Sequence, residues 1–243
     1  MGDTFGRIKG KYCITASNIA KYDFLHSLVI FDEHNPFLFN RKRIADYLST
    51  AVRWFKAANS AYKKAVYPFL MWNSLWRAGA SIEHGHLQLT LSPSCYPKIE
   101  FLRTLTEKYK KRYSRDYWQD LFSVHSALGL ATKYKKAKVI AYLTPIKEKE
   151  IIVLINKVID AVPVINALLT YYSKIGVDSF NLVFLLPPLT KEVEWDMPII
   201  ARILDRGRLS NKIADIGAME LYACSVVSND PFKLMEGLKK QLC

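Results

Sequence analysis

The sequence predicts an α+β fold built from two similar halves, each with an antiparallel sheet and packed helices. Strand-like segments come in adjacent pairs and do not alternate regularly with helices, which favours antiparallel over doubly wound parallel sheet. The order strand, strand, helix, strand, loop, strand occurs twice, which indicates an internal duplication. Half of the 243 residues are hydrophobic and 23% are charged, the composition of a globular protein with a sizeable core.

Each element of the first half is predicted from its own pattern. The first two segments are rich in β-branched and aromatic residues, which is typical of strands. The long segment after them carries apolar residues three and four apart, as an amphipathic helix requires. In order we expect strands Tyr12–Ser17 and His26–Phe31, helix Arg41–Lys64, strand Tyr67–Trp72, loop Asn73–Ser81, strand Glu83–Leu91, and helices Pro97–Tyr113 and Arg115–Ala131.

The second half follows the same order with weaker residue identity. We expect strands Lys138–Leu143 and Ile151–Ile155, helix Val162–Lys174, strand Ser179–Leu186, a loop with two prolines, and strand Met197–Leu204. The predicted halves are therefore residues 1–137, which carry the motif described below, and residues 138–243, which are degenerate.

The charge balance is strongly basic, with 35 Lys and Arg against 22 Asp and Glu, or +13. Such a surplus suits a phosphate-bearing ligand, a nucleic acid or an anionic membrane, but a solvated lysine-rich surface explains it equally well. Nine Lys and Arg against three acids, interleaved with aromatics, occupy Thr104–Lys138. Two helices with aromatics inward and lysines outward explain that segment more simply than nucleic-acid binding, so nucleic acid is not the expected partner.

Cysteine usage and hydropathy favour a cytoplasmic protein. The four cysteines form no C-x-x-C pair, so we expect free thiols in a reducing compartment: Cys13, Cys95, Cys224 and Cys243. The first residues contain no apolar stretch for a secretory signal. The most apolar run, Ile151–Leu169, is interrupted by polar residues and proline, so no membrane span is expected. Abundant lysine, tyrosine and isoleucine with only 10 glycines would suit a thermophile.

Chemistry-bearing residues concentrate in one segment. If His84–Leu91 is a strand, one face carries His84, His86, Gln88 and Thr90, and the other carries glycine and leucines. A single strand histidine is more often a hydrogen-bonded structural residue. Here the alternation is clean, and a preceding loop with Gly79, Ser81 and Arg77 could hold phosphate oxygens through backbone N–H groups, a hydroxyl and a positive charge.

These residues resemble the galactose-1-phosphate uridylyltransferase branch of the histidine-triad superfamily. The specific part is His-x-His-x-Gln with Asn73 eleven residues before the first histidine and Gly79-x-Ser81 between. The segment HSLVIFDEHN from His26 is similar to the family's "HEVIIE…HN". Weaker likeness continues in Phe180-Asn181, in Trp195–Arg202 against "FN…WHxH…PR", and in Ala218–Leu221 against "YEM".

The resemblance implies a fold of two histidine-triad-like halves and a two-step nucleotidyl transfer. His86 would attack the α-phosphorus of a nucleotide-sugar, and an acceptor phosphate would then collect the nucleotide. Gln88 would donate to a phosphoryl oxygen, and His84 would complete the catalytic group. Asn73, Arg77, Gly79 and Ser81 would bind phosphate, and Glu220 would bind sugar hydroxyls. The family also implies a homodimer that acts in carbohydrate metabolism.

Departures from the family leave alternatives open. His34 and His84 match the histidines of a family zinc site whose two cysteines have no counterpart here, so no cofactor is certain and a structural zinc stays open. Asp196 and Pro198 replace the histidines of the second half. The leading hypothesis is transfer from a nucleotide-sugar to a sugar-1-phosphate. The alternatives are phosphorolysis of a nucleotide-sugar or dinucleoside polyphosphate at the same site, and a protein that binds nucleotide or nucleic acid without turnover.

Overall fold

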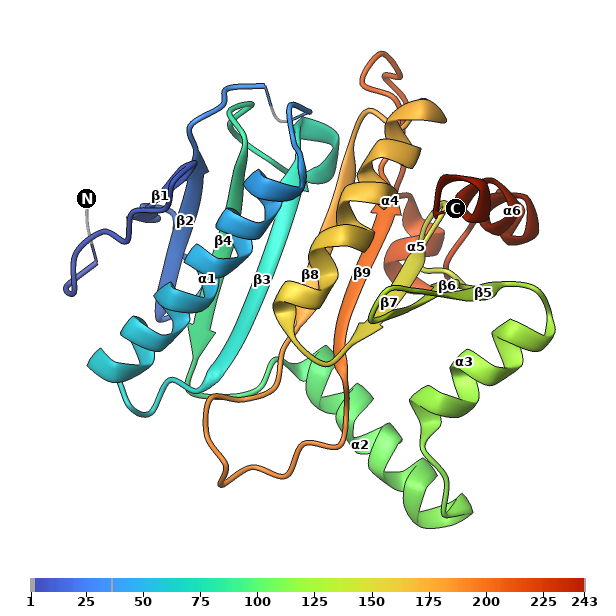
Figure 1. Ribbon diagram of the computed structural model, residues 1–243, viewed down its shortest axis with the longest axis horizontal. Helices are drawn as coiled ribbons and strands as arrows, with labels where there is room; N and C mark the ends of the chain where they lie inside the picture. The colour runs from blue at the N-terminus through green and yellow to red at the C-terminus, as the bar shows by residue number, and fades with distance from the viewer. Residues whose placement is uncertain (1–2, 36, 243) are drawn as a thin grey trace.

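The computed structural model describes residues 3–35 and 37–242, which form one nine-stranded antiparallel sheet with helices on both faces (Figure 1). The strand order is β1-β2-β4-β3-β8-β9-β7-β6-β5. The strands are β1 (Cys13–Ser17), β2 (Leu25–Phe31), β3 (Tyr67–Ser74), β4 (His86–Ser92), β5 (Ala131–Tyr134), β6 (Ala137–Ala141), β7 (Ile151–Ile155), β8 (Phe180–Leu185) and β9 (Ile199–Asp205). The predicted α+β class with antiparallel sheet is confirmed.

Helices connect the strands and close the chain. They are α1 (Arg41–Ala61), α2 (Pro97–Tyr113), α3 (Tyr117–Ala127), α4 (Val162–Lys174), α5 (Ala218–Tyr222) and α6 (Pro231–Leu242), with short 3-10 turns η1 (Trp76–Ala78) and η2 (Val158–Ala161). Helix α1 begins where the Asn40 side chain accepts a hydrogen bond from the Arg43 N–H at 3.0 Å. Among the described residues, no helix is long and apolar enough to cross a membrane.

The larger core lies between the sheet and helices α1 and α4, which run side by side across one face (Figure 1). Alternate strand residues such as Leu87, Leu89 and Phe184 point to this face and are fully buried. Trp54 of α1 is also fully buried, and Tyr47 stacks on Phe31 with ring centroids 3.8 Å apart. Burial of such large apolar side chains is the main stabilising contribution to the fold.

The opposite face of the sheet is only partly covered. Helices α2 and α3 pack Ile99, Trp118 and Phe122 against the β5–β7 end, where Ile152 and Ile200 complete a second core. Beside it the sheet lines a cavity of about 620 Å³. Its walls are mainly apolar and include Tyr22, Phe69, Met71, Val183, Leu185 and Leu204. Thr90 of β4 lines this cavity, and His86 and Gln88 alternate with core-facing leucines onto the same face of the sheet.

Strands β1–β4 and β6–β9 form two series that meet at the centre of the sheet, but β5, which belongs to the first predicted half, lies at the edge beyond β6. From one edge the order is β1-β2-β4-β3, and from the other, after β5, it is β6-β7-β9-β8, so that β3 and β8 pair at the centre. Helices α1 and α4 hold equivalent places in these two series. A duplicated unit would produce this order, and superposition of the halves stays a prediction. The expected division between residues 137 and 138 falls inside β6.

Most predicted elements are present within a few residues, with two notable differences. The helix expected over Arg115–Ala131 ends at Ala127, because Gly129 adopts a left-handed conformation (φ 77°) and the chain turns into β5. Strand β4 begins at His86 and not at Glu83 or His84, so His84 precedes the strand. Helices α5 and α6 and strand β5 were not anticipated by the periodicity.

Free thiols are found at the three cysteines that the structure describes. Burial raises the pKa of Cys13 to about 12 and that of Cys95 to about 11, so both thiols stay protonated at neutral pH. Cys243 lies outside the described residues.

One ion pair beside the cavity should contribute strongly to stability. The fully buried Glu150 carboxylate accepts from the Arg202 guanidinium at 2.5 Å and from the Ile146 N–H at 2.7 Å. We expect Glu150→Ala to lower the free energy of unfolding by about 3 kcal/mol, because Arg202 would lose its counter-charge in a largely apolar wall. Urea denaturation measures the change. The matched control, Glu236→Ala, breaks the exposed Glu236–Lys240 pair and should cost under about 0.5 kcal/mol; equal effects would contradict the prediction.

Candidate active site

Strand β4 presents a polar face beside the cavity. His86, Gln88 and Thr90 are all buried and alternate with leucines that point into the main core. The expected alternation is therefore present from His86 onward. The sequence predicted that His84 would also belong to this row. It does not, because β4 begins only at His86.

The ring of His86 is held in one tautomer by the chain itself. Its Nδ1 lies 2.8 Å from the carbonyl oxygen of His84. Because a carbonyl can only accept, Nδ1 carries a hydrogen and donates it, so the lone pair of the imidazole form lies on Nε2. A nucleophilic Nε2 is what attack on phosphorus requires. His84 contributes to this contact through its main chain.

The amide of Gln88 is oriented by a buried histidine on the neighbouring strand. Tyr22 N–H donates to His26 Nδ1 at 3.1 Å, and His26 Nε2 lies 3.0 Å from Gln88 Oε1. Burial lowers the pKa of His26, so the ring is neutral and its remaining hydrogen sits on Nε2. Gln88 thus accepts through Oε1, and its NH₂ group remains available as a donor.

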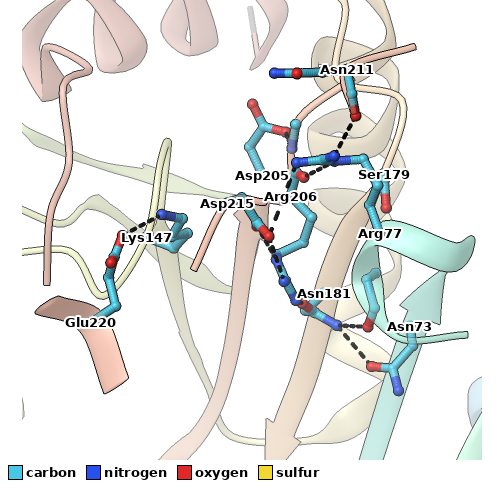
Figure 2. A network of polar contacts seen from close by, with 12 residues as sticks. Asn73, Arg77, Lys147, Ser179, Asn181, Asp205, Arg206, Asn211, Asp215 and Glu220 are labelled. Atoms are coloured by element: carbon cyan, nitrogen blue, oxygen red, sulfur yellow. Dashed lines mark hydrogen bonds and ion pairs between the residues drawn. The ribbon is translucent and has the colours of Figure 1, made fainter. Parts of the chain in front are cut away.

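A second amide lies one strand away, on β3. The β3–β4 ladder places Gln88 opposite Met71, and Asn73, two residues further along β3, pairs with Asn181 on β8. Asn181 Nδ2 donates to Asn73 Oδ1 at 2.8 Å (Figure 2). Alternation along β3 and β4 places Asn73 and Gln88 on the same face of the sheet as His86, and each amide has its oxygen engaged by another residue.

Residues of the predicted phosphate loop follow β3. Gly79 (φ 88°) adopts the left-handed conformation and Leu75 (φ 66°) also has a positive φ, so the chain bends on both sides of η1. Ala80 N–H donates to Leu75 O at 3.1 Å, which closes the turn. Ser81 is exposed at its tip. A Cβ at Gly79 would meet no atom within 4 Å, so open space adjoins the loop.

Arg77 is buried against the segment that follows β9. Its buried guanidinium donates to the carbonyl oxygens of Arg206 (2.8 Å), Asn211 (2.6 Å) and Ile213 (3.1 Å), as Figure 2 shows in part. Three of its five N–H groups are thus committed to the segment after β9. Arg77 holds that segment against the phosphate loop.

Loss of this clamp should destabilise the protein. We expect Arg77→Met to lower the free energy of unfolding by about 2–3 kcal/mol, because three carbonyl groups lose a charged donor. Differential scanning calorimetry or urea denaturation measures the loss. The control Arg208→Met, at a less buried arginine of the same segment, should change stability by less than about 0.5 kcal/mol. A mild effect at Arg77 would show that the clamp is dispensable.

His34 and His84 come together as the resemblance implied, but they do not form a metal centre by themselves. Their Nδ1 atoms lie 3.0 Å apart, and His84 Nε2 lies 2.7 Å from the carbonyl oxygen of Phe31. A structural zinc takes four ligands. The thiol of Cys13 is buried and donates to an Asp46 carboxylate oxygen at 3.4 Å. Among the described residues no three His, Cys, Asp or Glu side chains could share a metal, so these residues do not fit a structural zinc.

Glu220 and Asp196 are both engaged in ion pairs. Glu220 accepts from Lys147 Nζ at 3.0 Å and from the Gly217 N–H at 3.0 Å. The hydrogen bond from Gly217 and then the contact with Lys147 lower the pKa of Glu220. Figure 2 shows the Lys147–Glu220 pair to one side of Arg206. Asp196, in the degenerate second motif, pairs with Lys110 at 2.8 Å.

Three residues around the site received no role from the sequence. His26 and Asn181 belong to the matched segments, but nothing in their spacing shows that they contact Gln88 and Asn73. Arg206 donates to Asn181 Oδ1 at 2.7 Å and pairs with Asp215 at 2.7 Å. The β2–β4, β3–β8 and β8–β9 registers bring these side chains together.

Comparison with known proteins identifies the fold. No protein-family model matches the chain, and no curated protein matches its sequence. Among solved structures, a uridylyltransferase has a TM-score of 0.81 at 12% identity, covering 96% of this chain and 86% of its own. An ADP-glucose phosphorylase from Arabidopsis thaliana with bound ADP-glucose has a TM-score of 0.73 at 13% identity, covering 94% and 81%. A galactose-1-phosphate uridylyltransferase-like protein from the same plant has a TM-score of 0.73 at 14% identity, covering 94% and 83%.

The fold is therefore that of the uridylyltransferases and their phosphorylase relatives, as the sequence resemblance predicted. At such low identity the likeness concerns the arrangement of the chain. What the site does is argued from its own geometry.

Proposed function

We propose that the protein is a nucleotidyltransferase that works through a covalent nucleotidyl-histidine on His86. The observation that carries the proposal is the state of three neighbouring groups. His86 keeps its lone pair on Nε2, and Asn73 and Gln88 each have their oxygen engaged and an NH₂ group directed elsewhere. A nucleophile on the same face of the sheet as two amide donors suits attack on a charged phosphoryl group, whose oxygens gain charge as the bond forms.

The proposed reaction has two balanced steps. In the first, His86 Nε2 forms a bond to the α-phosphorus, and the bond from that phosphorus to the bridging oxygen of the leaving phosphate breaks with its electron pair. In the second, an oxygen of the acceptor phosphate attacks the same phosphorus, and the N–P bond breaks. The leaving phosphate bears its own negative charge and needs no general acid, which is consistent with glutamine at position 88. Gly79 and Ser81 would hold the phosphate chain.

For substrates, we propose a nucleotide-sugar donor and a sugar-1-phosphate acceptor, which would place the enzyme in carbohydrate metabolism. The solved structure with bound ADP-glucose has this fold. Glu220 and Lys147 pair with each other beside the network that contains Asn181 (Figure 2). A carboxylate and an ammonium group at that place can exchange their mutual contact for hydrogen bonds to sugar hydroxyls.

A second candidate is phosphorolysis of a dinucleoside polyphosphate at the same site, and the cavity favours it. The cavity walls are mainly apolar, so sugar hydroxyls buried there would meet few hydrogen-bond partners, which is costly. The flat face of a nucleobase could instead pack on Phe69 and Tyr22, which line the cavity. Inorganic phosphate would then take the nucleotide from His86.

Product analysis with defined donors and acceptors separates these candidates. Each nucleotide-sugar or diadenosine polyphosphate is incubated with a sugar-1-phosphate or inorganic phosphate, and products are followed by phosphorus NMR. Exchange with a sugar-1-phosphate supports the transferase, and a nucleoside diphosphate formed only with inorganic phosphate supports the phosphorylase. No turnover of any pair, together with salt-dependent binding of RNA or DNA that survives His86→Ala, would favour the non-catalytic alternative.

We also propose that the chain forms a homodimer. Several large apolar side chains of the segment after β9 are exposed: Ile213, Met219, Leu221, Tyr222 and Val226. A cluster of this kind on a monomer marks a contact surface, and Glu220 lies within it. Light scattering coupled to size-exclusion chromatography gives the mass in solution, and a mass near 27.9 kDa would contradict the dimer.

A further inference from the structure

The second half of the chain reaches the candidate site through a line of polar contacts. Asp215 Oδ2 accepts from Arg206 Nε at 2.7 Å, Arg206 Nη1 donates to Asn181 Oδ1 at 2.7 Å, and Asn181 Nδ2 donates to Asn73 Oδ1 at 2.8 Å. Figure 2 shows these side chains in sequence from the segment after β9 to strand β3. Asn181 Nδ2 also donates to the carbonyl oxygen of Ala78 at 2.9 Å.

Each contact in this line can run in only one direction. A guanidinium has no acceptor, so the atom of Asn181 beside Arg206 must be oxygen. A backbone carbonyl has no hydrogen to give, so the atom of Asn181 beside Ala78 must be the NH₂ group. The two requirements agree and fix the amide of Asn181. The atom of Asn73 that meets this NH₂ group must then be Oδ1, which leaves the NH₂ group of Asn73 on the other side.

The ion pair between Asp215 and Arg206 stabilises this orientation of the Asn181 amide. Burial alone would raise the pKa of Asp215, but the hydrogen bond and charge of Arg206 outweigh it, and the net pKa is lowered. Asp215 is therefore ionised at neutral pH and holds the Arg206 guanidinium toward Asn181. Both side chains are largely buried, at 15% exposure for Arg206 and 20% for Asp215, so solvent screens the pair less than a surface pair.

We propose that Asn181 is a positioning residue, which acts through Asn73 to aim a hydrogen-bond donor at the phosphoryl group attacked by His86. The proposal rests on the proposed function of His86. It gives the degenerate second half an active part in the reaction, because β8 supplies Asn181 and the segment after β9 supplies Arg206 and Asp215. With the amide of Asn73 reversed, its oxygen would face the phosphate and repel it.

The isosteric variant Asn181→Asp tests this. The new carboxylate still accepts from Arg206 but has no hydrogen for Asn73, so Asn73 turns its NH₂ group toward that carboxylate and its oxygen toward the substrate. We expect the single-turnover rate of nucleotidyl-histidine formation to fall about 100-fold, while the donor dissociation constant changes less than about fivefold. Asn166→Asp, on α4 away from the site, makes the same charge change and should keep the wild-type rate.

Asn73→Asp provides a variant that keeps the supporting contact. It still accepts from Asn181 and loses only the outward NH₂ group, so the fold is retained and a similar fall in rate is expected. A wild-type rate in Asn73→Asp would overturn the proposal even if Asn181→Asp folds poorly.

A double-mutant cycle with Asn73→Ala separates positioning from mere structural support. If Asn181 acts through Asn73, then Asn181→Asp has little further effect on the rate in the Asn73→Ala background. If the rate decrease in the double variant equals the product of the two single-variant decreases, the proposal is overturned. The wild-type protein in the same assay tests the premise. If the adduct forms equally fast in wild type and in Asn181→Asp, the positioning role of Asn181 is refuted but the proposed function is not. If wild type forms no adduct, both the proposed function and this inference are refuted.

Discussion

Replacing His86 by alanine is expected to lower the turnover number by roughly 10⁴-fold or more, because the bond-forming nitrogen is lost. The side chain is buried, and the contact that fixes its ring uses only Nδ1. Removing it should therefore leave the fold intact. Steady-state turnover with the best donor–acceptor pair measures the loss, and circular dichroism checks folding.

His84→Ala is the matched control for His86→Ala. The contact from His84 to His86 comes from a main-chain carbonyl, which alanine retains, so the reactive tautomer should persist. We expect a decrease of about tenfold or less from the lost packing against His34. If His84→Ala and His86→Ala were equally inactive, the assignment of His86 as the sole nucleophile would be wrong.

Gln88→His should change the fate of the intermediate. Glutamine can donate a hydrogen bond but cannot give up a proton, so water has no general acid to help it complete hydrolysis. An imidazole at this position could supply a proton. The variant would also lack the Gln88 carbonyl oxygen that accepts from His26. We expect transfer to slow by about 10²–10³-fold and the ratio of hydrolysis to transfer to rise.

Product ratios from phosphorus NMR, at saturating acceptor, measure this change. Gln119→His places the same substitution on exposed α3, where the side chain contacts Ser123 and Lys138, and should leave the ratio unchanged. An unchanged or lower ratio in a folded Gln88→His protein would assign the third strand position another role.

Local patterns were enough to predict most elements of this fold. The 3.6-residue period of α1 and the alternation from His86 to Thr90 are properties of the segment itself, and both are present in the structure. Strand β5 was missed because it is only four residues long, and helix α6 was missed because it depends on distant partners. Strand β5 is an edge strand paired only with β6, and α6 buries Leu234, Met235 and Leu238 against the core.

The basic aromatic segment was interpreted only in part. Trp118 and Phe122 face the second core as expected. Tyr113 is 52% exposed, and its ring lies 4.8 Å from that of Tyr109, so the tyrosines also pack on one another outside the core. Periodicity indicates which face of a helix is apolar, but it cannot show how far a helix pair extends beyond the sheet.

Prediction of the site from sequence was limited because several of its contacts join residues that are far apart along the chain. The motif indicates His86, Gln88 and Asn73, because these residues follow the spacing of one strand and the loop before it. It cannot show that Arg77 binds three carbonyl groups that lie 129, 134 and 136 residues further along the chain, or that His26 orients Gln88. Those contacts depend on sheet register and on the path of the segment after β9.

Intact-mass measurement after incubation with donor and no acceptor tests the central claim most directly. With a suitable nucleotide-sugar or dinucleoside polyphosphate, the protein should gain the mass of one nucleoside monophosphate, as an acid-labile and base-stable adduct that is absent from His86→Ala. No adduct with any UDP-, ADP- or GDP-sugar or dinucleoside polyphosphate, or an adduct that persists in His86→Ala, would contradict covalent catalysis by this histidine.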